Sequence, residues 1–290
     1  MMQQLKTVLL LAILSSFMLA VGSLIGGYQG LQIALIMALL MNVITYFFSA
    51  TLVLRLYRAQ SLDRTQYASV YAIVSELART MHIPMPTLWL IKTPMANAFA
   101  TGRNPQHAAV AVTTGILHLL DARELRGVLA HELSHIKNRD ILVSTIAATL
   151  ASAIGYFAYM LRYAAFFGSW GERSRRRSNF FGMVIISILM PLAAMLIQLA
   201  ISRSREYLAD HTGASCCQDP QALADALKKL HQHIPHAHLD EQDVQHASTA
   251  SLFIVHPFAG NGLSELFSTH PPLTQRIARL ERMQTTLRKK

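Results

Sequence analysis

The stretch DARELRGVLAHELSHIKNRD, from Asp121 to Asp140, decides the fold of this chain. Asp121 is followed three residues later by Glu124, a capping-box pattern that marks the first turn of a helix. Apolar residues then recur at helical spacing: Leu125, Val128, Leu129, Leu133 and Ile136. The stretch therefore predicts an amphipathic helix.

Two histidines, His131 and His135, are four residues apart on this helix, so both imidazoles leave from the same face. Glu132 follows the first of them. The pattern is His-Glu-x-x-His, which is typical of two zinc ligands and a general base. A third protein ligand must come from elsewhere and leave one position open for water. Because so short a pattern also occurs by chance, a second group of residues is needed to support the site.

The composition indicates a membrane protein. Of 290 residues, 52% are apolar and only 14% are charged, against about 25% charged in a typical soluble domain. The formal net charge of +10 fits membrane topology and anionic lipid headgroups, and no basic run interleaved with aromatics suggests a nucleic-acid partner. The adjacent Cys216 and Cys217 are expected to be reduced thiols on the cytosolic side rather than metal ligands.

Two apolar segments open the chain, at residues 5–25 and 31–54. Each is long enough to cross a bilayer, which takes ~20 residues, and residues 26–30 form an uncharged turn between them. A cleaved signal peptide is disfavoured because the first run is long and a second follows at once. Arg55 and Arg58 follow the second segment, so the positive-inside rule places that end in the cytoplasm. Residues 1–54 are therefore predicted to be two transmembrane helices.

Residues 55–140 look like the first part of a cytoplasmic domain. An amphipathic helix is predicted at 65–81, and short strands at 88–91, 97–102 and 108–113. A small sheet thus precedes the His-Glu-x-x-His helix. An exposed edge of such a sheet could bind an extended peptide as an added strand.

Two more apolar segments follow, at 141–167 and 180–201, with an arginine cluster at 172–177 between them. If both segments span, this cluster lies outside, against the positive-inside rule. The alternative is a shallow hairpin that never crosses, although the lengths favour spanning. Both arrangements return residues 202–290 to the cytoplasmic side as the second part of the same domain.

A second group of candidate site residues lies in SRSREYLAD, residues 202–210. Glu206 and Asp210 are four apart on one helix face. Glutamate is a suitable third zinc ligand, and an aspartate one turn later can accept the free ring N–H of a ligating histidine. The alternative is a solvated charged helix with Glu206 paired to Arg203. The presence of His-Glu-x-x-His favours the zinc interpretation.

The rest of the chain predicts a helix at 220–230 and a basic helix at 275–288. Between them lies a histidine-rich tract, for which a polar surface loop is favoured over a metal store: His231, His233, His236, His238 and His246. His270 is followed by two prolines, which hold its backbone so that it could point into a site. The alternative for His270 is a capping or surface role.

Four motifs occur in order: NAFATG from Asn97, HELSH from His131, SREYLAD from Ser204 and THPP from Thr269. Together with the apolar segments, they make the chain resemble the HtpX family of membrane-bound zinc metalloproteases, relatives of the Ste-type and Oma-type membrane peptidases. The resemblance covers nearly the whole chain. It implies a mainly α membrane protein with a small β-sheet, in which a zincin-like (gluzincin) metalloprotease domain is attached to four apolar membrane segments.

The resemblance also implies the metal-binding roles. His131, His135 and Glu206 are expected to hold one Zn²⁺ per subunit, and Glu132 to be the catalytic base. Asp210 matches the aspartate that orients a zinc ligand in this family.

Further roles implied by the resemblance concern the substrate. Asn97 matches a substrate-facing asparagine near the edge strand, and His270 the histidine that steadies the tetrahedral intermediate. The implied function is a zinc-dependent endopeptidase of the bacterial inner membrane, multi-pass, with its active site facing the cytoplasm. It would cleave misfolded or damaged membrane proteins as part of stress-induced quality control. One departure from the family pattern is His211, where a small residue is expected.

Two other functions are open on the residues alone. A non-catalytic scaffold would use zinc structurally, but structural sites usually have four closed ligands. A transporter should carry ionisable residues inside its spans, whereas these carry little beyond Asn42 and Gln198. Proteolysis is therefore the favoured function.

Overall fold

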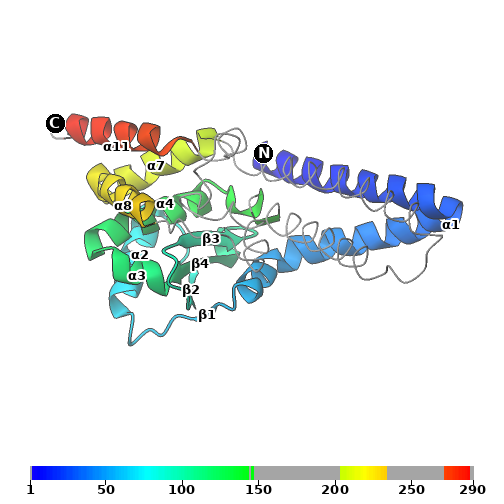
Figure 1. Ribbon diagram of the computed structural model, residues 1–290, viewed down its shortest axis with the longest axis horizontal. Coiled ribbons are helices and arrows are strands. Elements are labelled where there is room, and N and C mark those ends of the chain that lie inside the picture. Colours follow the sequence, from blue (N-terminus) through cyan, green and yellow to red (C-terminus); the bar gives the residue numbers. More distant parts are fainter. Residues whose placement is uncertain (1, 144, 147–202, 234–270, 288–290) are drawn as a thin grey trace, which may run out of the picture.

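The structure is a computed structural model of the chain, and it describes residues 2–143, 145–146, 203–233 and 271–287 (Figure 1). These residues form mostly helices with one small mixed sheet, as predicted. Several predictions concern residues that lie outside the described ones: most of the apolar segment 141–167, all of the segment 180–201, and His236, His238, His246 and His270.

Helix α1, Met2–Leu56, forms a hairpin. Its helical backbone is broken at Gly27, where φ is 55° and ψ is −135°, a conformation that glycine adopts readily because it has no Cβ. The two halves are in contact where the side-chain amide of Asn42 donates to Ser15 Oγ at 2.9 Å. The predicted turn between the first two apolar segments is therefore confirmed.

The membrane segments are confirmed only in part. Within the described residues, one helical segment, Gly27–Leu56, is long and apolar enough to cross a membrane. This segment contains the second predicted span. The other three of the four predicted segments remain predictions.

The sheet contains four strands in the order β1-β2-β4-β3. Strand β2 runs parallel to β4, while the β1–β2 and β3–β4 pairs are antiparallel. The three predicted strands are confirmed to within one residue, whereas β1 is too short to give a sequence signal. The strands are β1 Gln60–Ser61, β2 Thr87–Ile91, β3 Ala98–Gly102 and β4 Ala108–Thr113, with the 3-10 turn η1 Pro105–His107 between β3 and β4.

The two faces of the sheet pack against different partners. On one face, alternate residues such as Ala98, Ala100 and Val110 join the main core under the helices. On the other face, Phe99 and its neighbours pack against the end of α1. This second core consists of Val53, Leu54, Ile91, Phe99, Ala109 and Ala111. Because side chains alternate along a strand, β3 is buried on both sides. The sheet thus joins the end of α1 to the helical part of the domain (Figure 1).

Helix α4 lies at the centre of the helical part, in contact with α2, α7, α8 and β3 (Figure 1). Two glycines permit this close packing, because a Cβ at Gly127 would lie 2.7 Å from the backbone of Leu223 and one at Gly213 2.9 Å from that of Ala130. All five helices predicted for this part of the chain are present, whereas α3 was not predicted. The helices are α2 Ala68–Met81, α3 Thr114–Leu119, α4 Ala122–Lys137, α7 Arg203–Cys217, α8 Pro220–Gln232 and α11 Leu273–Leu287.

Helix α2 begins three residues later than predicted. The carboxylate of Asp63 accepts hydrogen bonds from the backbone N–H groups of Thr65 and Gln66, at 2.8 and 2.7 Å. An aspartate that bonds its own following backbone favours a turn over a helix. The chain therefore turns at 65–67 before the helix starts.

Candidate metal centre

Helix α4 brings two imidazoles together. The predicted capping box is present, because Glu124 N–H donates to Asp121 Oδ1 at 2.8 Å and Asp121 N–H donates to Glu124 Oε2 at 3.0 Å. One helical turn separates His131 from His135, and their Nε2 atoms are 3.2 Å apart. The two rings meet edge to face, with centroids 4.8 Å apart.

The third candidate ligand, Glu206, comes from α7. Its Oε2 lies 3.7 Å from His131 Nε2, and its Oε1 lies 3.7 Å from His135 Nε2. The possible ligand atoms of the three residues all lie within 4.8 Å of one another. Two imidazoles and a carboxylate are a donor set that suits zinc with one position left for water. Glu206 is buried, so the alternative of a solvated helix around it is wrong.

Asp210 and Arg276 support the first histidine. His131 Nδ1 lies 2.9 Å from Asp210 Oδ1, as predicted for an orienting aspartate. From α11, Arg276 donates to both carboxylate oxygens of Asp210, through Nε at 2.8 Å and Nη2 at 2.7 Å. Burial would raise the pKa of Asp210, but the charges of Arg276 and His131 outweigh it and lower the pKa to about 2. Asp210 is therefore a carboxylate at neutral pH.

Asp140 supports the second histidine, and the sequence did not predict this. His135 Nδ1 lies 3.0 Å from Asp140 Oδ2. The helix ends at Lys137, and Arg139 takes a left-handed backbone conformation with φ 58°, which turns the chain back toward the helix. The available signal is an aspartate five residues after the second histidine of the motif.

The charges around His135 affect its protonation. Burial alone would lower the pKa of His135, but the carboxylates of Asp140, Glu206 and Glu132 raise it to about 10. Arg205, which precedes Glu206, also interacts electrostatically with Asp140 and Glu206. Negatively charged carboxylates thus dominate the surroundings of the His135 imidazole.

Glu132 lies beside the three candidate ligands and is fixed on the sheet. Its Oε2 accepts a hydrogen bond from the backbone N–H of Ala100 in edge strand β3, at 2.9 Å. Only 5% of Glu132 is exposed. Burial raises its pKa, against the opposing effect of His131 and His135. A carboxyl group with a raised pKa is suited to taking up and releasing a proton near neutral pH.

Asn97 is buried immediately before β3. Its backbone N–H donates to Thr113 Oγ1 at 2.9 Å, and its carbonyl accepts from the backbone N–H of Thr113 at 3.0 Å. Asn97 therefore immediately precedes the strand whose Ala100 N–H binds Glu132, and its substrate-facing role stays a prediction. His270 lies outside the described residues, so its role also stays a prediction.

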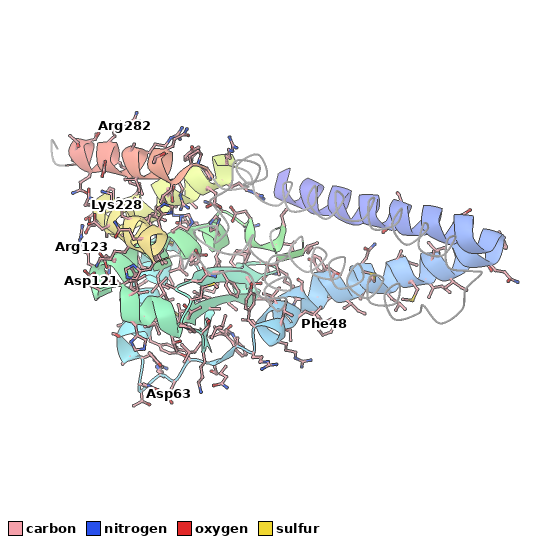
Figure 2. The ribbon with its side chains drawn as sticks, viewed as in Figure 1. Phe48, Asp63, Asp121, Arg123, Lys228 and Arg282 are labelled. Atoms are coloured by element: carbon pink, nitrogen blue, oxygen red, sulfur yellow. The ribbon has the colours of Figure 1, made fainter. Side chains whose placement is uncertain are left out.

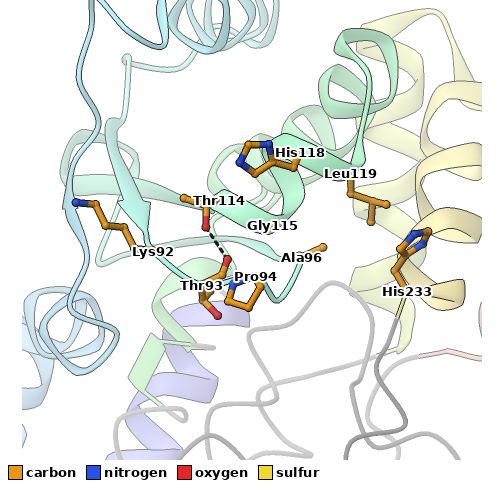
Figure 3. A pocket seen from close by; sticks show the side chains of 9 residues that line it. All are labelled: Lys92, Thr93, Pro94, Ala96, Thr114, Gly115, His118, Leu119 and His233. Atoms are coloured by element: carbon orange, nitrogen blue, oxygen red, sulfur yellow. Dashed lines mark hydrogen bonds between the residues drawn. The ribbon is translucent and has the colours of Figure 1, made fainter.

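A cavity of about 680 Å³ lies away from the metal centre, between the β2–β3 loop, α3 and the end of α8 (Figure 3). Lys92, His118 and His233 line it, but none of the three candidate metal ligands does. One wall is closed by a hydrogen bond from Thr114 Oγ1 to the carbonyl of Thr93, at 2.7 Å. Of the histidine-rich tract, His231 and His233 are described and are exposed, as expected for a surface segment.

Comparison with known proteins identifies the family of this chain. The sequence model of peptidase family M48 matches residues 64–284. A protease HtpX homolog of Syntrophobacter fumaroxidans is 49% identical over 280 residues, covering 96% of this chain and 98% of that protein. One of Paraburkholderia phytofirmans is 48% identical over 281 residues, covering 97% of each chain.

Among solved structures, the chain is similar to the crystal structure of S. mikatae Ste24p, with a TM-score of 0.52 and 17% sequence identity. The match covers 96% of this chain but 65% of that one, so the chain spans about two thirds of the length of Ste24p. This likeness concerns the fold alone. Because the family match and the two relatives each cover most of the sequence, the chain belongs to peptidase family M48 and is a membrane-associated metalloprotease.

Proposed function

We propose that this chain is a zinc-dependent endopeptidase of the bacterial inner membrane that cleaves misfolded or damaged membrane proteins during stress. The observation that carries the proposal is the convergence of His131, His135 and Glu206 beside the buried carboxyl group of Glu132. Peptide hydrolysis needs this combination, because the nucleophile is a water that must lose a proton during attack. The relatives named as HtpX proteases support the same activity.

The metal is proposed to be one Zn²⁺ per subunit. Imidazole nitrogen and carboxylate oxygen are common zinc donors, and three protein ligands are typical of catalytic rather than structural sites. A zinc ion in this position would polarise a bound water and bring the pKa of that water toward ~7. Asp210 and Asp140 each hold the Nδ1 side of one histidine, so both Nε2 atoms remain directed toward Glu206.

Glu132 is proposed as the general base and acid. Its carboxylate takes the proton of the attacking water and then delivers it to the leaving amine. The hydrogen bond from Ala100 N–H fixes one carboxylate oxygen and ties it to the edge strand. From the family resemblance, Asn97 contacts the substrate and His270 stabilises the charge that develops on the substrate carbonyl oxygen.

The membrane is proposed to determine which substrates reach this site. The protease domain is divided between residues 55–140 and 202–290, with membrane segments at 1–54 and 141–201. Arg55 and Arg58 at the end of α1 support a cytoplasmic site in a multi-pass protein. Because one face of the sheet packs on the end of α1, membrane-embedded substrates meet the site at a high effective concentration.

A comparison of the wild-type chain with Glu132→Gln tests the function. In detergent, both should bind one zinc ion, but only the wild type should hydrolyse a casein-like substrate. Glutamine keeps the size and the acceptor oxygen for Ala100 N–H while losing the ability to take up a proton. Full activity in Glu132→Gln would remove Glu132 from the mechanism.

A further inference from the structure

The membrane helix is longer than the bilayer requires. The segment Gly27–Leu56 contains 30 residues, which extend ~45 Å as an α-helix, whereas the hydrocarbon core is ~30 Å thick. If the turn at Gly27 lies at one membrane surface, the helix leaves the hydrocarbon after ~20 residues. The residues at that level are Tyr46, Phe47 and Phe48. Aromatic side chains concentrate at membrane–water interfaces. The length of the helix and its three aromatic residues therefore both place the interface near Phe47.

Just beyond this level, one face of α1 meets the sheet, while Leu52 and Leu56 on the other side stay 40% and 45% exposed. Phe47 and Phe48 are 53% and 55% exposed in the protein, as lipid-facing side chains would be. One to two turns later, Val53 and Leu54 are 2% and 7% exposed, because they pack against Phe99 and its neighbours in the sheet. Figure 2 shows Phe48 where α1 approaches the sheet, far from Arg282 on α11 at the upper left. The domain therefore begins where the bilayer is expected to end.

The turn between β3 and β4 reaches back to the aromatic level. The guanidinium carbon of Arg103 lies 5.2 Å from the ring centroid of Phe47, a distance typical of a cation–π contact. Arg103 is the first residue after β3. A cation at the membrane surface also attracts anionic lipid headgroups. Both the contact and the charge suit a turn that lies among the headgroups.

The same strand donates a hydrogen bond to the carboxyl group of Glu132 on α4. Ala100, whose N–H binds Glu132, lies in β3 and precedes Arg103, the first residue after the strand, by three residues. At ~3.4 Å per residue, this is a distance of ~10 Å. Strand β3 thus links the headgroup level to Glu132 directly.

We propose that the β3–β4 turn lies among the lipid headgroups and that β3 sets the distance from the bilayer at which the peptidase cuts. This inference rests on the proposed endopeptidase function and defines its substrate class further. The preferred bonds lie in segments that emerge from the membrane, about three extended residues beyond the hydrocarbon. Bonds inside a transmembrane helix stay out of reach.

A fluorescence experiment tests the position of the turn. The full-length chain, with Cys216 and Cys217 replaced by alanine, receives one cysteine at the exposed turn residue Gln106 or, as the control, at Arg282 on α11. Each variant is labelled with a fluorophore and reconstituted into vesicles whose lipids carry a headgroup quencher in both leaflets. We expect strong quenching at position 106 and little at 282. Equal quenching at the two positions overturns the proposed membrane contact.

A substrate series tests the distance. Single-span substrates carry one soluble tail, moved relative to the span by two residues at a time, and mass spectrometry locates the cuts. In every substrate, the cut nearest the membrane should lie about three residues or more beyond the span. Efficient cleavage within the span or at its first exposed residue overturns the distance rule.

A soluble casein-like substrate separates this inference from the proposed function. If the wild type cleaves it and Glu132→Gln does not, the endopeptidase function stands. Failure of the two membrane tests then removes only the inference about distance. A wild-type chain that binds zinc but cleaves neither kind of substrate removes the proposed function and the inference together.

Discussion

His135 Nδ1 lies 3.0 Å from Asp140 Oδ2, so the second histidine of the motif is held by a carboxylate from its own stretch of chain. The first histidine is held differently, because Asp210 comes from α7 and is itself fixed by Arg276 from α11. Both contacts involve Nδ1 and leave Nε2 for a metal. Such carboxylate partners fix the ring orientation and make a ligating histidine more basic.

The contact between Asp140 and His135 predicts that Asp140→Asn weakens zinc binding about 10- to 100-fold. A loss of this size is typical when the carboxylate partner of a ligating histidine is removed. Asparagine keeps the shape and can still cap the helix that starts at Ile141, so the fold should survive. Affinity is measured by competition with a chelating dye. The matched control is Asp121→Asn, the same substitution at the N-cap of α4. Wild-type affinity in Asp140→Asn would show that the charge of Asp140 does not strengthen zinc binding.

If Glu206 is the third metal ligand, as proposed, its removal should abolish zinc binding. Glu206→Ala leaves only two protein donors and should lose stoichiometric zinc, because catalytic sites need three. Metal content is measured after dialysis and compared with Glu281→Ala, which removes an exposed carboxylate on α11 that pairs with Lys228. Retention of one zinc ion by the Glu206 variant would show that another residue is the ligand.

The motif residues could be predicted because they depend on local geometry. A helix of about 3.6 residues per turn puts His131 and His135 on one face wherever the helix packs. Asp121 and Glu124 fix where that helix starts. Glu206 and Asp210 follow the same spacing rule, and the requirement for a third ligand connects them with the first pair.

The residues that sequence reasoning missed depend on tertiary structure. Arg276 reaches Asp210 from 66 residues further along the chain, and no spacing rule relates the two. Asp140 reaches His135 only because Arg139 takes a left-handed conformation, which is uncommon for a non-glycine residue. Likewise, the hydrogen bond from Ala100 to Glu132 depends on how the sheet packs against α4.

The acidic surroundings of His135 predict that zinc affinity rises with pH. Without metal, the neighbouring carboxylates raise the pKa of His135 to about 10, so the imidazole carries a proton at neutral pH. Zinc binds only the neutral ring, and binding must therefore release that proton. Affinities measured at pH 6 and pH 8 should favour pH 8, with proton release in weakly buffered solution. Equal affinities and no released proton would contradict a protonated His135.

The buried pair of Arg276 and Asp210 predicts a large effect on stability. Only 1% of Arg276 is exposed, and removal of its charge leaves Asp210 and Glu206 buried without it. Breaking a buried pair in this way typically costs about 3–5 kcal/mol. Arg276→Met should therefore lower the unfolding temperature in detergent, followed by tryptophan fluorescence. Arg276→Lys should lose less, because it keeps the charge but not the two parallel hydrogen bonds.

The pH dependence of the unfolding temperature shows whether the stability lost in Arg276→Met comes from the pair with Asp210. The pKa of Asp210 falls from the usual 3.8 to about 2 in the folded chain. Its stabilising contribution is therefore present above about pH 4 and is lost as pH falls toward 2. Arg276→Met should remove most of this acid-sensitive contribution, whereas Arg282→Met, an exposed change on the same helix, should keep the wild-type unfolding temperature and pH profile. An Arg276→Met chain that unfolds like the wild type would mean that α11 does not stabilise the metal centre through this pair.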